Sequence, residues 1–162
     1  MPAFQAARLL HEYTQTNYAP PERVFPLLCP VREAEWVPQW QYRMIYSQSG
    51  VVERECVFLT PEEDGSETIW QCTDYQPEAF LIAYAWVRPS LMTAQIRIQL
   101  EPRDDGKTNA HIRYAYTALS EAGNAELKRM DRTWFEHKMS SWQSAIDHYL
   151  RTGKLVDAAG WE

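Results

Sequence analysis

The chain has 162 residues, of which 45% are hydrophobic and 23% charged, so it fits one globular domain better than two. Its formal net charge of −6 and the lack of any basic run disfavour nucleic-acid binding, because a phosphate backbone would be repelled. No run of 18 apolar residues is present, and the N-terminal stretch is too short and interrupted for a signal peptide. We therefore expect no membrane insertion.

The residues that most often bind metals or carry catalysis show no recognised spacing. The three cysteines, Cys29, Cys56 and Cys72, are an odd number without metal-like spacing, which favours a reduced, cytoplasmic setting. The four histidines are scattered over three elements, and no glycine-rich phosphate loop, Rossmann fingerprint or nucleophile motif occurs. We expect no metal and no cofactor.

The first quarter of the chain combines one strand with two short helices. Residues 4–16 read as a strand, which Pro20-Pro21 ends. Residues 22–29 favour a helix, since Pro21 suits its first turn and Pro30 stops it. A second helical turn is expected at 31–36.

From residue 41 onward the hydrophobic period is two, which is typical of strands with one buried face. Asp105-Gly106 is a strong hairpin signal between the last two strands. Strands joined by turns this short form an antiparallel meander. The six expected strands cover residues 41–48, 51–60, 67–75, 79–87, 91–101 and 108–119.

Residues 120–151 show the only long helical period of the chain. Ser120 is the expected N-cap, and Gly153 the expected stop. A helix of these 32 residues is about 48 Å long and can lie across the sheet. We expect one domain over residues 1–153 and a C-terminal tail over 154–162. The apolar helix face comprises Leu127, Met130, Trp134, Phe135, Met139, Trp142, Ala145, Ile146, Tyr149 and Leu150.

This order of elements resembles the helix-grip fold of the SRPBCC superfamily, which includes START, Bet v 1-like and polyketide cyclase/dehydratase-like proteins. The local matches are PERVF at 21–25, EWVPQW at 35–40 and LSEAGN at 119–124, which resemble an uncharacterised bacterial branch. Gln39 stands where similar sequences are expected to have glycine. The resemblance implies an α+β fold, in which a curved seven-stranded antiparallel sheet surrounds a long C-terminal helix, with two short helices after the first strand. It also implies an elongated apolar cavity for a lipid, a polyketide-like aromatic or another hydrophobic small molecule.

Many inward-facing aromatic side chains are candidates to line such a cavity. Trp36 and Trp40 either frame its mouth or plug the open end of the sheet as core, and Glu33 and Glu35 beside them are expected to be solvated. The sequence cannot separate a cavity-lining residue from ordinary core, because both are apolar and inward. The further candidates are Trp70, Tyr84, Trp86, Met92, Ile96, Tyr114 and Tyr116 on strands, with Met130, Trp134 and Trp142 on the helix.

Two charged residues fall on the apolar sector of the helix. Asp131 either points into the cavity, as a polar anchor or general acid/base, or lies at the rim and pairs with Arg113 or another basic residue. Lys138, one turn after Trp134, either lies over that ring or extends to solvent.

The leading functional hypothesis is non-covalent binding of a hydrophobic or aromatic small molecule by a carrier, sensor or sequestering protein, as a monomer or homodimer. The second is a polyketide cyclase/dehydratase-like enzyme that uses Asp131 as acid/base. The third is a protein-interaction module, similar to chaperone activators, that uses the outer face of the sheet. A cavity below about 300 Å³ would count against the first two.

Overall fold

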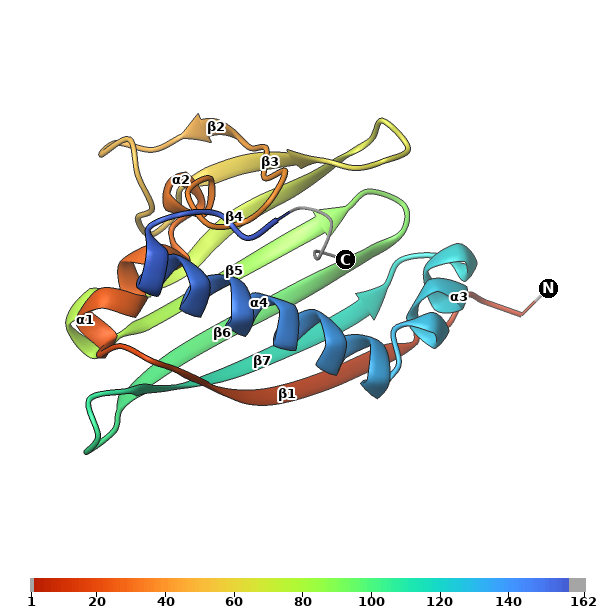
Figure 1. The fold of residues 1–162 in the computed structure, drawn as a ribbon. Coiled ribbons are helices and arrows are strands. Elements are labelled where there is room, and N and C mark those ends of the chain that lie inside the picture. The colour runs from red at the N-terminus through yellow and green to blue at the C-terminus, as the bar shows by residue number, and fades with distance from the viewer. Residues whose placement is uncertain (1, 158–162) are drawn as a thin grey trace.

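The computed structural model describes residues 2–157 (Figure 1). Strand β1 (Arg8–Asn17) is followed by helix α1 (Pro21–Val24), the 3-10 turn η1 (Phe25–Leu28) and helix α2 (Pro30–Glu33). A second 3-10 turn, η2 (Pro77–Ala79), joins two of the later strands, and the chain then ends in two helices, α3 (Glu121–Arg129) and α4 (Arg132–Thr152). The remaining strands are β2 (Arg43–Tyr46), β3 (Val57–Pro61), β4 (Glu67–Gln76), β5 (Leu81–Arg88), β6 (Met92–Pro102) and β7 (Thr108–Ala118).

The strands form one antiparallel sheet in the order β1-β7-β6-β5-β4-β3-β2. Strands β2 to β7 are therefore a meander, and β1 adds to it beside β7. The alternation predicted for β6 is present, since Ala94, Ile96 and Ile98 are all at most 3% exposed while Gln95 and Arg97 between them are exposed. Helix α4 crosses the buried face of the sheet (Figure 1), so the expected α+β helix-grip architecture is confirmed.

The core has two parts. The larger cluster fills the space between the sheet and the first half of α4, where Phe135 and Met139 are fully buried. The smaller cluster joins the C-terminal half of α4, through Ala145 and Ile146, to Leu27 of η1 and to Trp36 just after α2. The two short helices thus close one end of the sheet against α4.

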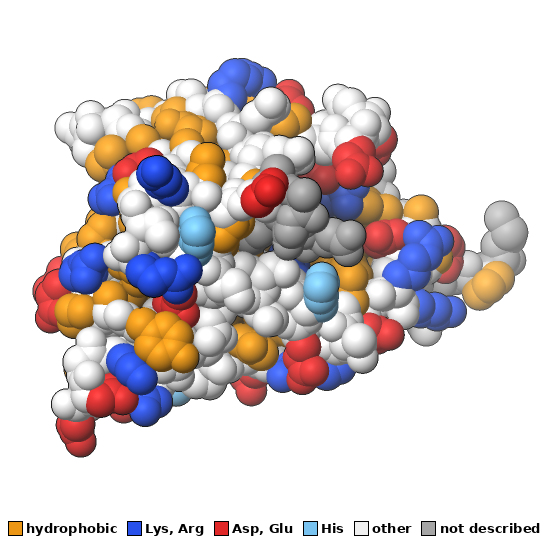
Figure 2. All heavy atoms as spheres, in the orientation of Figure 1, with side chains coloured by type: hydrophobic (Ala, Val, Ile, Leu, Met, Phe, Trp, Pro, Cys, Tyr) orange, Lys and Arg blue, Asp and Glu red, His pale blue; other side chains and the backbone are white. Residues whose placement is uncertain are grey.

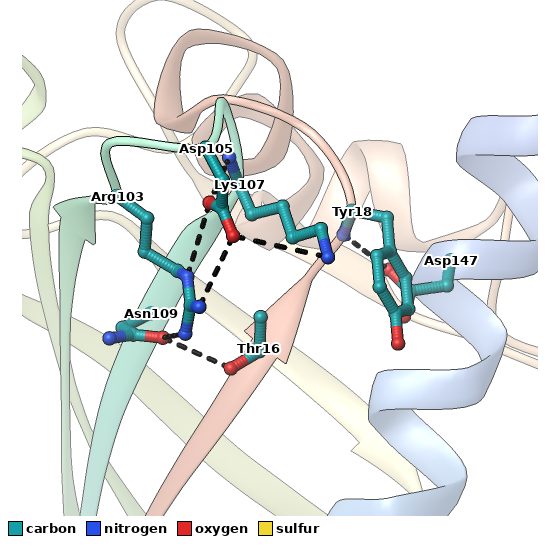
Figure 3. A network of polar contacts seen from close by, with 7 residues as sticks. All are labelled: Thr16, Tyr18, Arg103, Asp105, Lys107, Asn109 and Asp147. Atoms are coloured by element: carbon teal, nitrogen blue, oxygen red, sulfur yellow. Dashed lines mark hydrogen bonds and ion pairs between the residues drawn. The ribbon is translucent and has the colours of Figure 1, made fainter.

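Polar contacts fix the end of the sheet where β1 and the β6–β7 hairpin meet α4 (Figure 3). Asp105 in the hairpin turn pairs with Arg103 at 3.2 Å, and the Lys107 ammonium lies 4.6 Å from the centre of the Tyr18 ring. The Asp147 carboxylate of α4 accepts a hydrogen bond from the Tyr18 backbone N–H at 3.0 Å. The Asp147 contact joins α4 to the chain that leaves β1.

The single helix predicted over residues 120–151 is wrong in one respect, because the helix is broken between α3 and α4. Asp131 is the N-cap of α4, and its carboxylate accepts a hydrogen bond from the Trp134 backbone N–H at 2.9 Å. The Met130 carbonyl, turned out of the helix, accepts a hydrogen bond from His11 Nε2 at 2.8 Å. A short acidic side chain that binds the backbone ahead of it starts a helix, so Asp131 marks a new beginning rather than an interior position.

The two outer ends predicted for this C-terminal helical segment are confirmed, whereas the helix expected at 22–29 is divided into α1 and η1 and the turn expected at 31–36 ends at Glu33. Ser120 is the N-cap of α3 and accepts a hydrogen bond from the Gly123 N–H at 3.1 Å, while Gly153 ends α4 with a φ of 69°. Gln39 has a φ of 60°, a left-handed conformation that glycine adopts without strain. That conformation explains why glycine is expected at this corner.

Some predicted boundaries move. The strand expected at 51–60 begins only at Val57, because residues 51–56 form a loop in which the Glu53 carboxylate accepts hydrogen bonds from Ser47 and Ser49. The expected first strand begins at Arg8 rather than at residue 4. The tail expected over 154–162 lies outside the described residues from residue 158 onward.

The face that carries α4 has acidic and basic side chains interspersed, with no broad area of one sign (Figure 2). Within residues 2–157, no helix combines the length and the apolar character needed to cross a bilayer.

Candidate functional site

A cavity of about 340 Å³ lies between the buried face of the sheet and the α3–α4 segment. We call it the main cavity. Its volume lies within the range of small-molecule sites, and above the limit that would count against ligand binding. A depression of about 400 Å³ near α1 is more open and includes the charged Arg23 and Arg32. The main cavity is lined by Val37, Trp40, Glu62, Thr68, Trp70, Trp86, Arg88, Met92, Tyr114, Tyr116, Glu126, Met130, Trp134, Lys138 and Trp142.

A smaller space of about 40 Å³, called here the recess, adjoins the main cavity on the α2 side. Trp40, Trp70, Tyr114 and Trp142 line both spaces and so form the boundary between them. The main cavity includes charged, partly exposed side chains, whereas most of the recess wall is buried and apolar. The other residues of the recess are Leu28, Glu33, Phe58, Tyr84, Ile96 and Ile98.

Several aromatic rings of this wall are held by their own polar atoms. Trp40 Nε1 donates to the Pro30 carbonyl at 2.8 Å, and Trp70 Nε1 donates to the Thr60 hydroxyl at 2.9 Å. The Tyr84 hydroxyl donates to a backbone carbonyl of η1 at 2.9 Å. Because these polar atoms are already satisfied, the rings present apolar surface in a fixed arrangement.

Tyr116 behaves differently. Its hydroxyl is buried and has no hydrogen-bond partner among the described residues, although the residue is only 1% exposed and lines the main cavity. Burial, and to a lesser extent Tyr114, raises its pKa, so the hydroxyl keeps its proton at neutral pH. A buried hydroxyl without a partner costs free energy, and a ligand oxygen or nitrogen could remove that cost.

Lys138 supplies a positive charge inside the main cavity. Its ammonium lies 5.2 Å from the centre of the Trp134 ring and 5.3 Å from that of Tyr114. No ion pair found within residues 2–157 involves Lys138. Burial lowers its pKa to about 8, an effect that Glu62 partly opposes. Of the two alternatives drawn from sequence, the position over the Trp134 ring is the one that the structure shows.

The acidic side chains of the main cavity already have partners. The Glu62 carboxylate lies 3.8 Å from Arg88 and accepts a hydrogen bond from the Thr68 hydroxyl at 2.5 Å. Glu126 pairs with Arg129 at 2.7 Å. The unpaired charge on this wall is therefore the ammonium of Lys138, which favours a ligand with an anionic or hydrogen-bond-accepting group.

Glu33 is the most unexpected residue of the site. The expectation that it is solvated is wrong, since the residue is 7% exposed and its side chain lines the recess. Burial raises the pKa of Glu33 well above its usual value. A sequence signal existed, because Glu33 lies three and four residues before the buried Trp36 and Val37 and so shares their helical face.

The structure brings most of the sequence-predicted residues together. Tyr84 and Ile96 line the recess rather than the main cavity. Those that line the main cavity are Trp40, Trp70, Trp86, Met92, Tyr114, Tyr116, Met130, Trp134, Lys138 and Trp142. Sequence reasoning missed Val37, Glu62, Thr68, Arg88 and Glu126 there, and Leu28, Glu33, Phe58 and Ile98 in the recess.

Trp36 lies outside both spaces. It is fully buried, donates from Nε1 to the Leu27 carbonyl at 2.8 Å and packs edge-on against Trp142 with 5.3 Å between ring centres. Trp36 is therefore core, whereas Trp40 lines the cavity.

Asp131 also lies elsewhere. The prediction that it points into the cavity is wrong, because its carboxylate caps α4 and the residue is exposed. The alternative partner Arg113 pairs with Glu12 at 3.8 Å instead. No group of three potential metal ligands occurs among residues 2–157.

A seven-stranded antiparallel sheet that encloses a cavity beneath a C-terminal helix defines a helix-grip protein, and comparison with solved structures confirms this fold. Norcoclaurine synthase from Thalictrum flavum aligns with a TM-score of 0.67 at 10% identity, over 91% of this chain and 88% of the other. The Zhui aromatase/cyclase from Streptomyces sp. R1128 aligns with a TM-score of 0.64 at 14% identity, over 93% and 100%. Ara h 8.0201 gives 0.62 at 14% identity, over 90% and 99%.

These neighbours are Bet v 1-like and SRPBCC proteins, so the resemblance drawn from sequence is confirmed at the level of the fold. No protein-family model and no curated protein matches the sequence.

Proposed function

We propose that this protein binds a hydrophobic, aromatic small molecule non-covalently in the main cavity. The observation that carries the proposal is a space of about 340 Å³ walled by fixed aromatic rings and containing one unpaired ammonium, that of Lys138. Flat aromatic ligands stack on such rings, and a few polar groups then fix their orientation.

The structural neighbours support this proposal by analogy. Norcoclaurine synthase has been solved in complex with dopamine and hydroxybenzaldehyde, both small aromatic molecules, and another neighbour is an aromatase/cyclase. All of these proteins are under 25% identical to this chain, so their ligands guide the choice of probe rather than name the ligand.

The two other hypotheses have less support. The enzyme that uses Asp131 as acid/base loses its residue, because Asp131 caps α4 outside the cavity. The protein-interaction module needs an apolar outer face on the sheet, but on β6 this face carries Thr93, Gln95, Arg97 and Gln99.

The first test asks whether the cavity is the place where ligands bind. Isothermal titration with 2-acetylnaphthalene, a neutral aromatic probe, should show one site in the wild-type protein. Met130→Trp fills the main cavity and should weaken binding at least about tenfold, since the added ring occupies the ligand's space. Ile69→Trp adds the same ring at a residue that is 40% exposed and outside the cavity lining, and should bind like the wild type.

Equal binding by Met130→Trp and the wild type, with both variants folded by thermal unfolding, would contradict the proposal. Native mass spectrometry of protein purified without added ligand complements the titration. A retained small molecule would identify the ligand class directly.

A further inference from the structure

The recess contains a carboxyl group without a partner. Glu33 is more than nine-tenths buried, and no hydrogen bond or ion pair to its side chain is found among residues 2–157. Its backbone is fully used, since the Glu33 carbonyl accepts hydrogen bonds from the Trp36 and Val37 N–H groups at 3.1 and 2.7 Å. The fold therefore holds α2 firmly and turns a carboxyl group toward an apolar space.

The groups that face Glu33 offer it no positive charge. From β5 comes Tyr84, whose hydroxyl donates to a backbone carbonyl, and from β7 comes Tyr114; burial raises both tyrosine pKa values, and Glu33 adds to each rise. On its own helix, Arg32 is paired with Glu35 near the surface. Strands β3, β4 and β6 and helix α4 contribute rings and aliphatic side chains to the recess.

A carboxyl group in such surroundings keeps its proton at neutral pH, because no cation compensates for a buried charge. A protonated carboxyl group is a strong hydrogen-bond donor, and in the free protein its O–H has no acceptor among the described residues. The recess has room for one water molecule, so a ligand acceptor oxygen that enters it would replace that water as the hydrogen-bond partner of the carboxyl group.

The size of the recess limits what can reach Glu33. Its volume of about 40 Å³ is close to the ~30 Å³ that one water molecule occupies in the liquid. A terminal oxygen fits there, whereas an aromatic ring must stay in the main cavity, against the rings that line both spaces.

We propose that the protonated Glu33 carboxyl group donates a hydrogen bond to a carbonyl oxygen at the inner end of the ligand, so that the site selects aromatic carbonyl compounds. This inference rests on the proposed function, since it names the class of ligand for the same cavity. A ligand amine is disfavoured, because the ammonium of Lys138 lies in the main cavity and would repel a second cation.

The test compares two probes of nearly the same shape, 2-acetylnaphthalene and 2-isopropenylnaphthalene, which differ in a C=O against a C=CH₂ group. At pH 6 the wild-type protein should bind the ketone about tenfold more tightly than the alkene. Glu33→Met should bring this ratio close to one. Glu33→Gln should keep a ratio of several-fold, because its amide N–H still donates.

The pH dependence supplies a second readout. The wild-type preference for the ketone should fall as pH rises through the raised pKa of Glu33, since an ionised carboxylate cannot donate. The preference of Glu33→Gln should stay constant over the same range.

The possible results distinguish a carbonyl-binding Glu33 from the alternatives. A ratio near one in the wild type, or a ratio unchanged in Glu33→Met, overturns the inference while leaving small-molecule binding intact. Tighter binding of 1-(2-naphthyl)ethylamine than of the ketone, lost in Glu33→Gln, overturns it in favour of a cation site. If neither naphthalene probe binds, the proposed function itself fails, and the inference with it.

Discussion

Replacing Glu33 with methionine should stabilise the ligand-free protein. The residue is 7% exposed, its carboxyl group has no partner among residues 2–157, and moving a polar group of this kind into largely apolar surroundings costs about 1–3 kcal/mol. Methionine has a similar length and no polar atom, so the free energy of unfolding at pH 7 should increase by about 2 kcal/mol. For a protein of this size, that change raises the midpoint of thermal unfolding by roughly 4–8 °C.

The pH dependence of this effect has a definite sign. Burial raises the pKa of Glu33 in the folded protein, whereas in the unfolded chain it is about 4.3. Between these two values the folded state holds a proton that the unfolded state has lost, so the stability of the wild type falls as pH rises. The advantage of Glu33→Met should therefore be smallest near pH 4 and should grow above it until the folded-state pKa is passed.

Chemical denaturation from pH 4 to pH 8 measures this difference, and Glu22→Met provides the matched control at an exposed position of α1. The control should change stability by less than ~0.5 kcal/mol at every pH. Destabilisation by Glu33→Met would mean that the carboxyl group has a partner, and an advantage that did not change with pH would mean that its pKa is not raised. Either result would contradict the description of the recess.

Three further predictions concern the other end of the cavity and the helices around it. Lys138→Met should weaken binding of the anionic 2-naphthoate about tenfold. In the wild type this binding should weaken as pH rises through about 8, where Lys138 loses its proton. If the affinity did not change in titrations from pH 6 to 9.5, the ammonium would not contact the ligand carboxylate. Asp131→Ala removes the N-cap of α4 and should lower the free energy of unfolding in urea by about 1 kcal/mol, whereas Asp131→Asn should be close to the wild type. Both variants should bind 2-acetylnaphthalene like the wild type, and a loss of binding would mean that Asp131 contacts the ligand. Gly123→Ala should destabilise the protein by ~1–3 kcal/mol although alanine favours helices, because the new methyl carbon would lie 1.9 Å from the Leu91 carbonyl oxygen. A gain in stability would contradict that close approach.

The sequence predicts the sheet well because the alternation of apolar and polar residues within a strand shows which of its faces is buried. On β6 and β7 the alternation of apolar and polar residues follows directly from one face lying under α4, and the short turns leave no other connection. The resemblance of the order of elements to the helix-grip fold implies a seventh strand in the sheet, but the place of β1 beside β7 comes from the structure, because alternation within a strand cannot give it.

Non-local contacts set the limits of prediction. Asp131 falls in the apolar sector of a continuous helix, yet the contact between His11 and the Met130 carbonyl stabilises a break at that point, and the helix phase of the sequence cannot show it. Whether an aromatic ring lines a cavity or fills the core likewise depends on which residues of other elements pack against it. Trp40 lines the main cavity and Trp36 is core, although the two are only four residues apart.

The charged residues of the site follow no simple sequence pattern. The sequence predicts a solvated Glu33, because acidic side chains are mostly exposed, although its spacing from Trp36 places it on the buried helical face. Arg88 and Glu62 lie at positions where the sequence predicts turns. The fold brings the end of β5 and the end of β3 together, so that both side chains line one cavity.

Methionine methyl NMR can show whether a small aromatic molecule binds between the sheet and α4. Met92 and Met130 line the main cavity, whereas Met44 on β2 and the fully buried Met139 of α4 are not among its lining residues. With ¹³C-labelled methionine methyl groups, titration of 2-acetylnaphthalene should shift the Met92 and Met130 signals along one saturable curve, because the probe's ring current acts at short range. The Met44 and Met139 signals should move little. Shifts at Met44 or Met139 without shifts at Met92 and Met130 would place the binding site elsewhere and would contradict binding in the main cavity.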